Sequence, residues 1–214
     1  MRLVAILLFA AVAAPPAAPS AHAQSPLVIN EILAGPARDW DASGAFSSRD
    51  DEWVELKNVS GSSLDLTGYF ITDGDSIPRY ALSGPLGAGA HLLVFGRTSY
   101  DWERATGHPA FGLSLGNSGD QVILWKITGP DTAAVDTYTY RSHEAAADRA
   151  IGRSPDGSGG WALFDALNLY SGTLLPAGTG CAPSPGAANA CGSTPTQSTS
   201  WGRVKTLYRG TTRR

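Results

Sequence analysis

Residues 28–33 read Val-Ile-Asn-Glu-Ile-Leu, and residues 51–58 read Asp-Glu-Trp-Val-Glu-Leu-Lys-Asn. The first run is short and largely apolar, and the second alternates polar with apolar residues, a pattern typical of a half-buried strand. In the second run the apolar residues are predicted to line the core and the charged residues mostly to face outward. The inward set is Trp53, Val54 and Leu56, and the outward set is Glu52, Glu55 and Lys57.

Further short runs follow, separated by turns rich in Gly, Pro, Asn and Asp. We expect strands over 64–72 (broken at Gly68), 79–82, 91–95, 111–115, 121–127 and 135–140. Residues 100–106 are compatible with one helical turn, and residues 149–161 read as an irregular return. About eight or nine short strands at this spacing, without helix–strand alternation, predict an all-β antiparallel β-sandwich.

The first 23 residues have the pattern of a cleaved secretory signal. Arg2 precedes an apolar run from Leu3 to Ala14, and Ala21-His22-Ala23 places small residues at the cleavage position. An uncleaved anchor is the alternative, but this run is short for a bilayer and prolines follow it. No later segment is apolar enough to span a membrane, so we expect a secreted, periplasmic or cell-surface protein.

Composition divides the remaining chain into a domain and a tail. Residues 24–192 are expected to form one β-sandwich domain, residues 193–200 a Ser/Thr/Pro linker and residues 201–214 a basic tail. The tail has five basic residues and no acidic one, whereas the domain is acidic. Because an acidic body repels phosphates, nucleic acid is not an expected partner. The tail could contact an anionic surface or simply be solvated.

Cys181 and Cys191 are the only cysteines. In an exported protein such a pair is expected to form a disulfide, and the turn-rich segment between them can fold back. A zinc site is the alternative. It would need further ligands nearby, and no histidine is close in the sequence.

The segment between the first two predicted strands has the oxygen-ligand spacing of a calcium loop. A twelve-residue loop of this kind supplies oxygens from positions 1, 3, 5, 7, 9 and 12, with Gly at position 6. Counting from Asp39, Gly44 falls at position 6. The predicted ligands are Asp39, Asp41, Ser43, the Ala45 carbonyl, Ser47 (directly or through water) and Asp50.

This loop resembles the EF-hand-like loop of dockerin modules, which also ends in Asp. Ser43 at position 5 removes one charge, which should weaken calcium binding, and flanking helices are not evident. Asp51 and Glu52 are alternative ligands. The other explanation is an acidic, solvated loop without an ion. The Asp73-Gly74-Asp75 run is a weaker calcium candidate and is better explained as a plain turn.

Groups suited to catalysis are scarce. His91, His108 and His143 are each expected to be structural or exposed, and no nucleophile elbow, zinc-protease helix or phosphate-cradling loop occurs. A Glu52–Glu55 pair could serve glycoside chemistry but is better explained as exposed strand charge. Among the aromatic residues, Trp53 and Trp125 are assigned to the core. The candidate partner contacts are Trp40, Trp102, Trp201 and Tyr208.

Several segments, in order, resemble a bacterial lamin-tail domain. They are Asn30–Leu33, Asp51–Asn58, Leu66–Asp73, Gly87–Val94, Leu113–Leu124, Arg153–Gly157 with Trp161, and Pro183–Asn189. Together they cover nearly all of residues 27–190. The resemblance implies an immunoglobulin-like sandwich and little about activity, since fold does not determine function. In bacteria such domains occur in exported proteins, sometimes beside nucleases, hydrolases or anchoring modules.

We therefore expect a secreted, non-enzymatic binding or adhesion module with an unidentified protein or polysaccharide partner at the cell envelope. Calcium is the expected cofactor and would stabilise the first long loop. A metal-dependent extracellular hydrolase, either a nuclease or a glycosidase, or an accessory domain of one, is the alternative. A third hypothesis gives the tail a sorting or docking role. The sequence indicates no oligomeric state.

Overall fold

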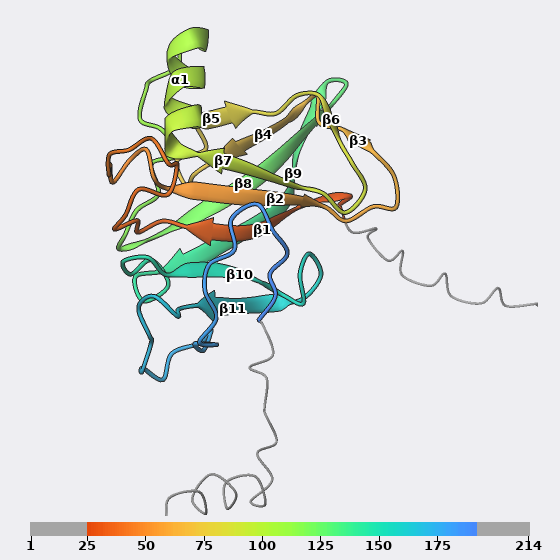
Figure 1. Cartoon of the computed structure of the whole chain (residues 1–214). Helices are drawn as coiled ribbons and strands as arrows, with labels where there is room; N and C mark the ends of the chain where they lie inside the picture. The colour runs from red at the N-terminus through yellow and green to blue at the C-terminus, as the bar shows by residue number, and fades with distance from the viewer. Residues whose placement is uncertain (1–24, 192–214) are drawn as a thin grey trace, which may run out of the picture.

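A computed structural model describes residues 25–191, which form two facing antiparallel sheets with one helix at the edge (Figure 1). The first sheet consists of β1 (Leu27–Leu33), β2 (Trp53–Asn58), β7 (His91–Phe95), β10 (Ala150–Ser154) and β11 (Gly160–Phe164). The second consists of β4 (Tyr69–Thr72), β5 (Pro78–Ala81), β8 (Gly119–Thr128) and β9 (Asp131–Arg141). A small pair, β3 (Leu64–Asp65) and β6 (Pro85–Leu86), and the helix α1 (Gly96–Thr106) complete the fold.

The strand order is β11-β10-β1-β2-β7 in the first sheet and β5-β4-β8-β9 in the second. Every strand pair is antiparallel, and the prediction of an all-β, immunoglobulin-like sandwich is confirmed. The main core lies between the sheets. Its fully buried members include Ile29, Leu56, Ile71, Val122 and Leu124, which come from strands of both sheets.

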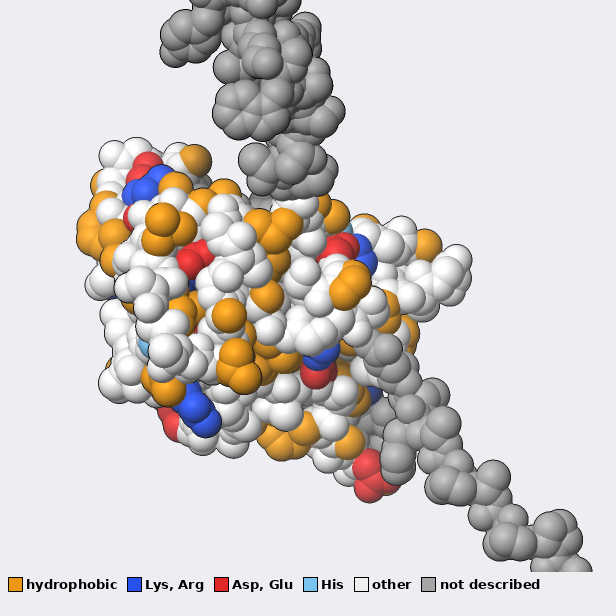
Figure 2. Space-filling model, turned by 90° about the horizontal axis from the view of Figure 1, so that it is seen from below, with side chains coloured by type: hydrophobic (Ala, Val, Ile, Leu, Met, Phe, Trp, Pro, Cys, Tyr) orange, Lys and Arg blue, Asp and Glu red, His pale blue; other side chains and the backbone are white. Residues whose placement is uncertain are grey.

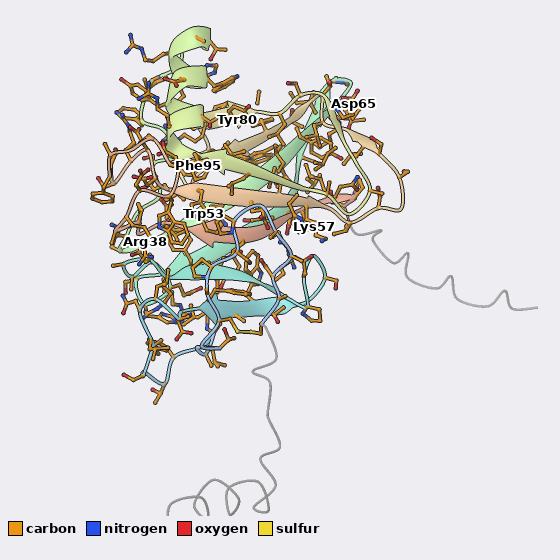
Figure 3. All side chains as sticks on the ribbon, in the orientation of Figure 1. Arg38, Trp53, Lys57, Asp65, Tyr80 and Phe95 are labelled. Atoms are coloured by element: carbon orange, nitrogen blue, oxygen red, sulfur yellow. A yellow bond between two sulfur atoms is a disulfide. The ribbon has the colours of Figure 1, made fainter. Side chains whose placement is uncertain are left out.

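A second apolar cluster covers the outer face of the five-stranded sheet. It consists of Leu33, Trp53, Ala150 and Phe164, with Trp40, Leu93, Phe95 and Cys181 packed against it. The loop after β1 and the segment after β11 supply the covering residues, so the central strands are buried on both faces. Figure 3 shows Trp53 and Phe95 near each other, and the two residues are paired across β2 and β7.

The prediction that Glu52 and Glu55 face outward is wrong. Glu55 is fully buried and Glu52 is 7% exposed, whereas Lys57 is half-buried. Trp53 is buried as expected but belongs to the outer cluster, because neighbouring residues of a strand point to opposite faces. Trp125, which was assigned to the core, is half-buried and stacks on Phe70.

Three local predictions also differ from the structure. α1 has 11 residues instead of one turn, residues 111–115 form no strand, and the expected irregular return contains β10 and the start of β11. The helix begins directly after β7, at Gly96. A side chain at this position would place its Cβ 1.8 Å from the Arg49 carbonyl oxygen, so only glycine fits there without a shift.

The disulfide between Cys181 and Cys191 is present, with the two Cα atoms 5.2 Å apart. In the part of the chain that the structure describes, no helix is long and apolar enough to cross a membrane. The predicted signal (1–23), linker (193–200) and basic tail (201–214), with Trp201 and Tyr208, lie outside the described residues.

Candidate metal centre

The loop that joins β1 to β2 is attached to the body by Trp40. The Trp40 ring packs edge-on against Trp53 with centroids 6.1 Å apart, and its Nε1 donates to Asp148 Oδ1 at 2.8 Å. Arg38 Nε donates to the other oxygen of the same carboxylate at 2.9 Å. Figure 3 shows Arg38 near Trp53 on this side of the molecule. Trp40, a predicted partner contact, is therefore half-buried and has internal partners.

Asp51 holds the loop closed from within. Its side chain is fully buried, and its carboxylate accepts hydrogen bonds from the backbone N–H groups of Trp40 (2.6 Å), Asp41 (3.0 Å) and Ser47 (2.7 Å). Hydrogen bonds to an ionised acceptor are short and roughly twice as strong as neutral ones. One carboxylate therefore fixes the backbone at the start of the predicted calcium loop and at Ser47, in its second half.

The carboxylates of Asp39, Asp41 and Asp51 form a cluster in which one oxygen of each lies within 4.8 Å of the others. Asp39 accepts from the backbone N–H groups of Ser43 (3.0 Å) and Gly44 (2.8 Å), and Asp41 accepts from Ser43 (2.9 Å). Burial opposes ionisation of Asp41, but the hydrogen bonds from Ser43 outweigh it and lower the pKa of this carboxyl. Clustered carboxylate oxygens are the ligands that Ca²⁺ prefers.

The other predicted ligands lie apart from this cluster or are engaged with one another. The Ser43 hydroxyl donates to the Ala45 carbonyl at 3.1 Å, and the Ser47 hydroxyl accepts from the Asp50 backbone at 3.2 Å. The Asp50 carboxylate accepts from Arg49 Nε at 2.6 Å. Asp51, the next residue, occupies the place in the cluster that the spacing assigned to Asp50.

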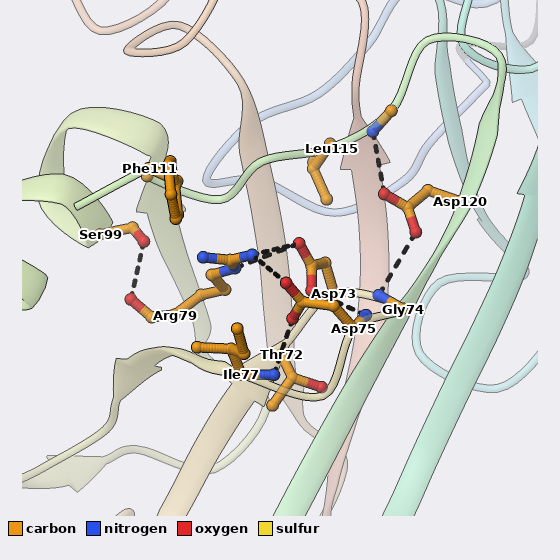
Figure 4. A network of polar contacts seen from close by, with 12 residues as sticks. Thr72, Asp73, Gly74, Asp75, Ile77, Arg79, Ser99, Phe111, Leu115 and Asp120 are labelled. Atoms are coloured by element: carbon orange, nitrogen blue, oxygen red, sulfur yellow. Dashed lines mark hydrogen bonds and ion pairs between the residues drawn. The ribbon is translucent and has the colours of Figure 1, made fainter. Parts of the chain in front are cut away.

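The Asp73–Asp75 turn, the weaker calcium candidate, binds an arginine (Figure 4). Arg79, which is 2% exposed, donates from Nη2 to Asp73 (2.8 Å) and Asp75 (2.7 Å), and from Nη1 to Glu103 (3.3 Å). Burial raises the pKa of Asp73 to about 6 although Arg79 acts in the opposite direction. The arginine thus joins the turn after β4 to α1.

A second group of buried carboxylates holds the segment that follows β11. Glu31 accepts from the backbone and hydroxyl of Ser184 (3.2 and 2.9 Å), and Glu55 accepts from the Gly186 backbone at 2.6 Å. Asn189 Nδ2 donates to the Asn30 carbonyl at 3.0 Å. We call residues 181–191 the closing segment. Sequence periodicity missed this network, and only the family resemblance of its Pro183–Asn189 run marked it.

Burial dominates the electrostatics of both glutamates. It raises the pKa of Glu31 to about 8 and also raises the pKa of Glu55, against the opposing hydrogen bonds. Asp156, close by, pairs with Lys57, and although burial opposes its ionisation, these polar contacts lower its pKa to about 2. Because these carboxylates accept hydrogen bonds from backbone N–H groups, their role is structural.

A sequence comparison shows to which family the chain belongs, and the arrangement of strands agrees with it. A family model described as the lamin tail domain matches residues 20–142, more than half of the chain. The chain belongs to the lamin tail domain family. A search of curated proteins finds no match to it. The matched region of this lamin tail domain ends after β9, yet β10 completes the first sheet by pairing with β1.

The remaining candidate residues of this lamin tail domain lie in three places. Trp102 stacks on His108 with centroids 4.7 Å apart and lines an apolar cavity of about 280 Å³ between α1 and the second sheet. His91 Nε2 lies 3.1 Å from Lys57 Nζ. His143 packs beside Tyr170, with centroids 5.1 Å apart. None of these three histidines adjoins the Asp39 cluster as the described residues place it.

Proposed function

We propose that this protein is an exported, non-enzymatic lamin tail domain that binds a protein or polysaccharide at the cell envelope, with its first long loop stabilised by calcium. One observation carries the calcium part of the proposal: the Asp39, Asp41 and Asp51 carboxylates converge within 4.8 Å. Three like charges at this spacing repel one another, and a divalent cation would remove that repulsion.

The surroundings of the cluster support a stabilising role for the ion. Asp51 already ties the loop to the buried start of β2, while Asp39 and Asp41 are half-buried and can complete a shell with water. The same loop presents Phe46, which is 54% exposed. A calcium ion would therefore order a loop that carries an apolar contact residue. Extracellular calcium modules of this kind bind with dissociation constants of about 10⁻⁴ to 10⁻³ M.

The chain without residues 1–23 should bind calcium. Calorimetric titration should give saturable heat, and the melting temperature should rise with calcium. A concentration ten times the dissociation constant stabilises the folded state by about 1.4 kcal/mol. The Asp39→Asn/Asp41→Asn double variant should lose both responses. Asp131→Asn removes an exposed carboxylate at the start of β9 and should retain them.

Absence of heat and of a melting shift at millimolar calcium would refute the calcium part. A metal-dependent cleavage of DNA or polysaccharide that disappears in the double variant would replace the binding role by a hydrolase. The binding role itself is tested by retention of envelope components from an extract, with and without a chelator. Failure to retain any protein or polysaccharide under both conditions contradicts it.

A further inference from the structure

A pocket lies where the end of the loop after β1 meets the segment that follows α1. Its volume is about 320 Å³, at the lower end of the range for small-molecule sites. Ser48, Arg49 and Glu52 line it from the loop and the residue before β2, and Phe111 and residues 114–117 line it from the segment after α1. We call it the Phe111 pocket.

Buried carboxylates hold the segment after α1 in place. The fully buried Glu103 accepts from the Phe111 backbone N–H at 2.7 Å, and Glu52 accepts from the Leu115 N–H at 3.1 Å. Between these two points Ser114 has a φ of 58°, in the left-handed region that residues with a Cβ rarely adopt. Residues held in this way concentrate at ligand sites. This wall of the pocket is therefore fixed by contacts within the chain.

The wall that comes from the loop after β1 is fixed as well. The Arg97 N–H at the start of α1 donates to the Asp50 carbonyl at 3.1 Å, and Arg49 Nε donates to the Asp50 carboxylate at 2.6 Å. The Arg49 guanidinium lies over the Tyr100 ring, 3.9 Å from its centroid. Because all these contacts are made within the chain, this wall does not depend on the proposed calcium ion.

Phe111 gives the pocket an exposed aromatic ring. Its side chain is 56% exposed, and the Arg79 guanidinium lies over the ring, 5.5 Å from its centroid (Figure 4). Among the seven large hydrophobic residues exposed in residues 25–191, only Phe111 and Phe46 are aromatic. Phe46 belongs to the same loop as Ser48. Both exposed aromatic residues therefore belong to the two segments that form the pocket.

The other exposed hydrophobic residues are aliphatic. Four of them are leucines in the loop that follows β11: Leu167, Leu169, Leu174 and Leu175. Figure 1 places this loop at the lower end of the molecule, and Figure 2 looks at that end, where hydrophobic side chains are scattered between polar and charged groups. Leu169 does not line the Phe111 pocket and is 69% exposed, so it is a suitable control for exposed apolar area.

The rest of the lining is polar and presents no uncompensated charge. Three exposed residues supply hydroxyl and amide groups: Ser48, Ser114 and Asn117. The charge of Arg49 is balanced by Asp50. Glu52 is 7% exposed, and burial raises its pKa to about 8, so at neutral pH its carboxyl is mostly protonated and can donate a hydrogen bond.

We propose that the Phe111 pocket binds a neutral sugar unit of a polysaccharide, with one face of the sugar ring packed on Phe111. A hexose ring carries C–H groups on its faces, which pack on the electron-rich face of an aromatic ring. Its hydroxyl groups lie around the edge, where they would exchange hydrogen bonds with Asn117, Ser114 and the Glu52 carboxyl. An apolar wall with a few placed polar groups fixes the orientation of a ligand.

The lining favours a sugar over a protein side chain or a lipid. An apolar side chain or an acyl chain would cover the serine, asparagine and carboxyl groups without giving them hydrogen-bond partners, which is unfavourable. An acidic sugar would find no unpaired cation, because Arg49 is already paired with Asp50. This inference rests on the proposed binding role, names polysaccharide as the partner and is independent of calcium.

The test is native electrophoresis of the chain without residues 1–23 in gels that contain a neutral polysaccharide (dextran, mannan or galactan) or the acidic polygalacturonate. At least one neutral polysaccharide should retard the chain. Phe111→Ala should raise the dissociation constant by about fivefold, because the stacking face is lost. Asn117→Ala should raise it by about fivefold through the loss of hydrogen bonds. Phe111→Trp keeps an aromatic face and should bind as the unchanged chain does.

Leu169→Ala is the control for exposed apolar area and should leave the retardation unchanged. Melting temperatures show that each variant is folded. Retardation of Phe111→Ala equal to that of the unchanged chain overturns the proposal, as does an equal loss in Leu169→Ala or retardation by polygalacturonate alone. No retardation in any gel overturns it too. If the chain then still retains an envelope protein from an extract, the proposed binding role stands and only the sugar site is wrong.

Discussion

Tyr138 and Tyr140 lie two residues apart on β9 and differ in how their hydroxyls are satisfied. The Tyr138 hydroxyl donates to Glu144 Oε2 at 2.5 Å, and its ring stacks on Trp161. The Tyr140 side chain is only 2% exposed, yet its hydroxyl has no hydrogen-bond partner among the described residues. A buried hydroxyl without a partner costs about 1–3 kcal/mol.

These contacts predict opposite effects of the same substitution. Tyr140→Phe should leave the free energy of unfolding unchanged or raise it by up to about 1 kcal/mol, because it removes an unsatisfied group. Tyr138→Phe should lower it by about 1–3 kcal/mol, because Glu144 Oε2 loses its donor and keeps none in its place. Urea denaturation of both variants measures the difference. A larger loss in Tyr140→Phe than in Tyr138→Phe would contradict the prediction and would point to a bound water or ion at that hydroxyl.

At the scale of elements, the loop between β1 and β2 acts as a structural unit. Asp51 accepts three backbone hydrogen bonds, and Trp40 packs on Trp53 beneath it. Asp50, its neighbour, is instead half-buried and paired with Arg49. The two adjacent aspartates therefore have different tasks, although both were candidate ligands.

Asp51→Ala should destabilise the fold even when a chelator removes calcium. The loss of three hydrogen bonds to one carboxylate should lower the free energy of unfolding by about 2–4 kcal/mol. The loss is no larger because water can reach part of the backbone that Asp51 satisfies. Asp50→Ala removes a partly exposed ion pair with Arg49 and should cost about 1 kcal/mol, less than Asp51→Ala. Denaturation with near-ultraviolet circular dichroism follows both the stability and the Trp40–Trp53 packing. Equal losses in the two variants would show that Asp51 does not hold the loop.

At the scale of the whole molecule, the closing segment joins the two ends of the described chain. Glu31 on β1 and Glu55 on β2 bind its backbone, and the disulfide closes it on itself. Together with the loop after β1 and the outer apolar cluster, this segment turns a half-exposed sheet into a buried one. The two carboxyls lie under this cover, which explains their raised pKa values.

Stability should therefore depend on pH through Glu31. In the folded protein its carboxyl keeps the proton up to about pH 8, whereas in the unfolded chain it releases it near 4.5. The contribution of Glu31 is thus fully present below pH 4.5 and is lost as the pH rises towards 8, by up to about 1.4 kcal/mol per pH unit. Asp156, whose pKa is lowered, affects stability in a different pH range. Its contribution is lost only as the pH falls from about 3.8 towards 2.

Glu31→Gln removes this titration and should flatten the fall of stability between pH 5 and 8 by about one proton's slope. Burial also raises the pKa of Glu52 to about 8. Because of Glu52, the stability of Glu31→Gln should still fall as the pH rises through this range. Denaturation midpoints measured across this range test both statements. Asp131→Asn, at an exposed position, should keep the slope of the unchanged chain. An unchanged slope in Glu31→Gln would mean that Glu31 is ionised in the folded protein at neutral pH.

Individual elements show which parts of the fold could be predicted from the sequence. β2 and β8 were predicted because their alternation or apolar runs are local and strong. β10 and β11 were missed, since Ala150–Ser154 contains a glycine and an arginine and becomes a strand by pairing with β1. In the candidate site, Asp39 and Asp41 were found from their spacing. Asp51 was only an alternative ligand, because the direction of a carboxylate depends on which backbone groups surround it.

The sequence alone determined the fold class and the place of the acidic loop, because alternation, turn residues and ligand spacing are properties of neighbouring residues. The tertiary structure decided which charges are buried. Glu31 and Glu55 have the surroundings of outward-facing strand residues when β1 and β2 are considered by themselves. They lose contact with water only because the closing segment, more than 120 residues further along the chain, folds over them. Burial depends on what covers a residue, and no local pattern records that.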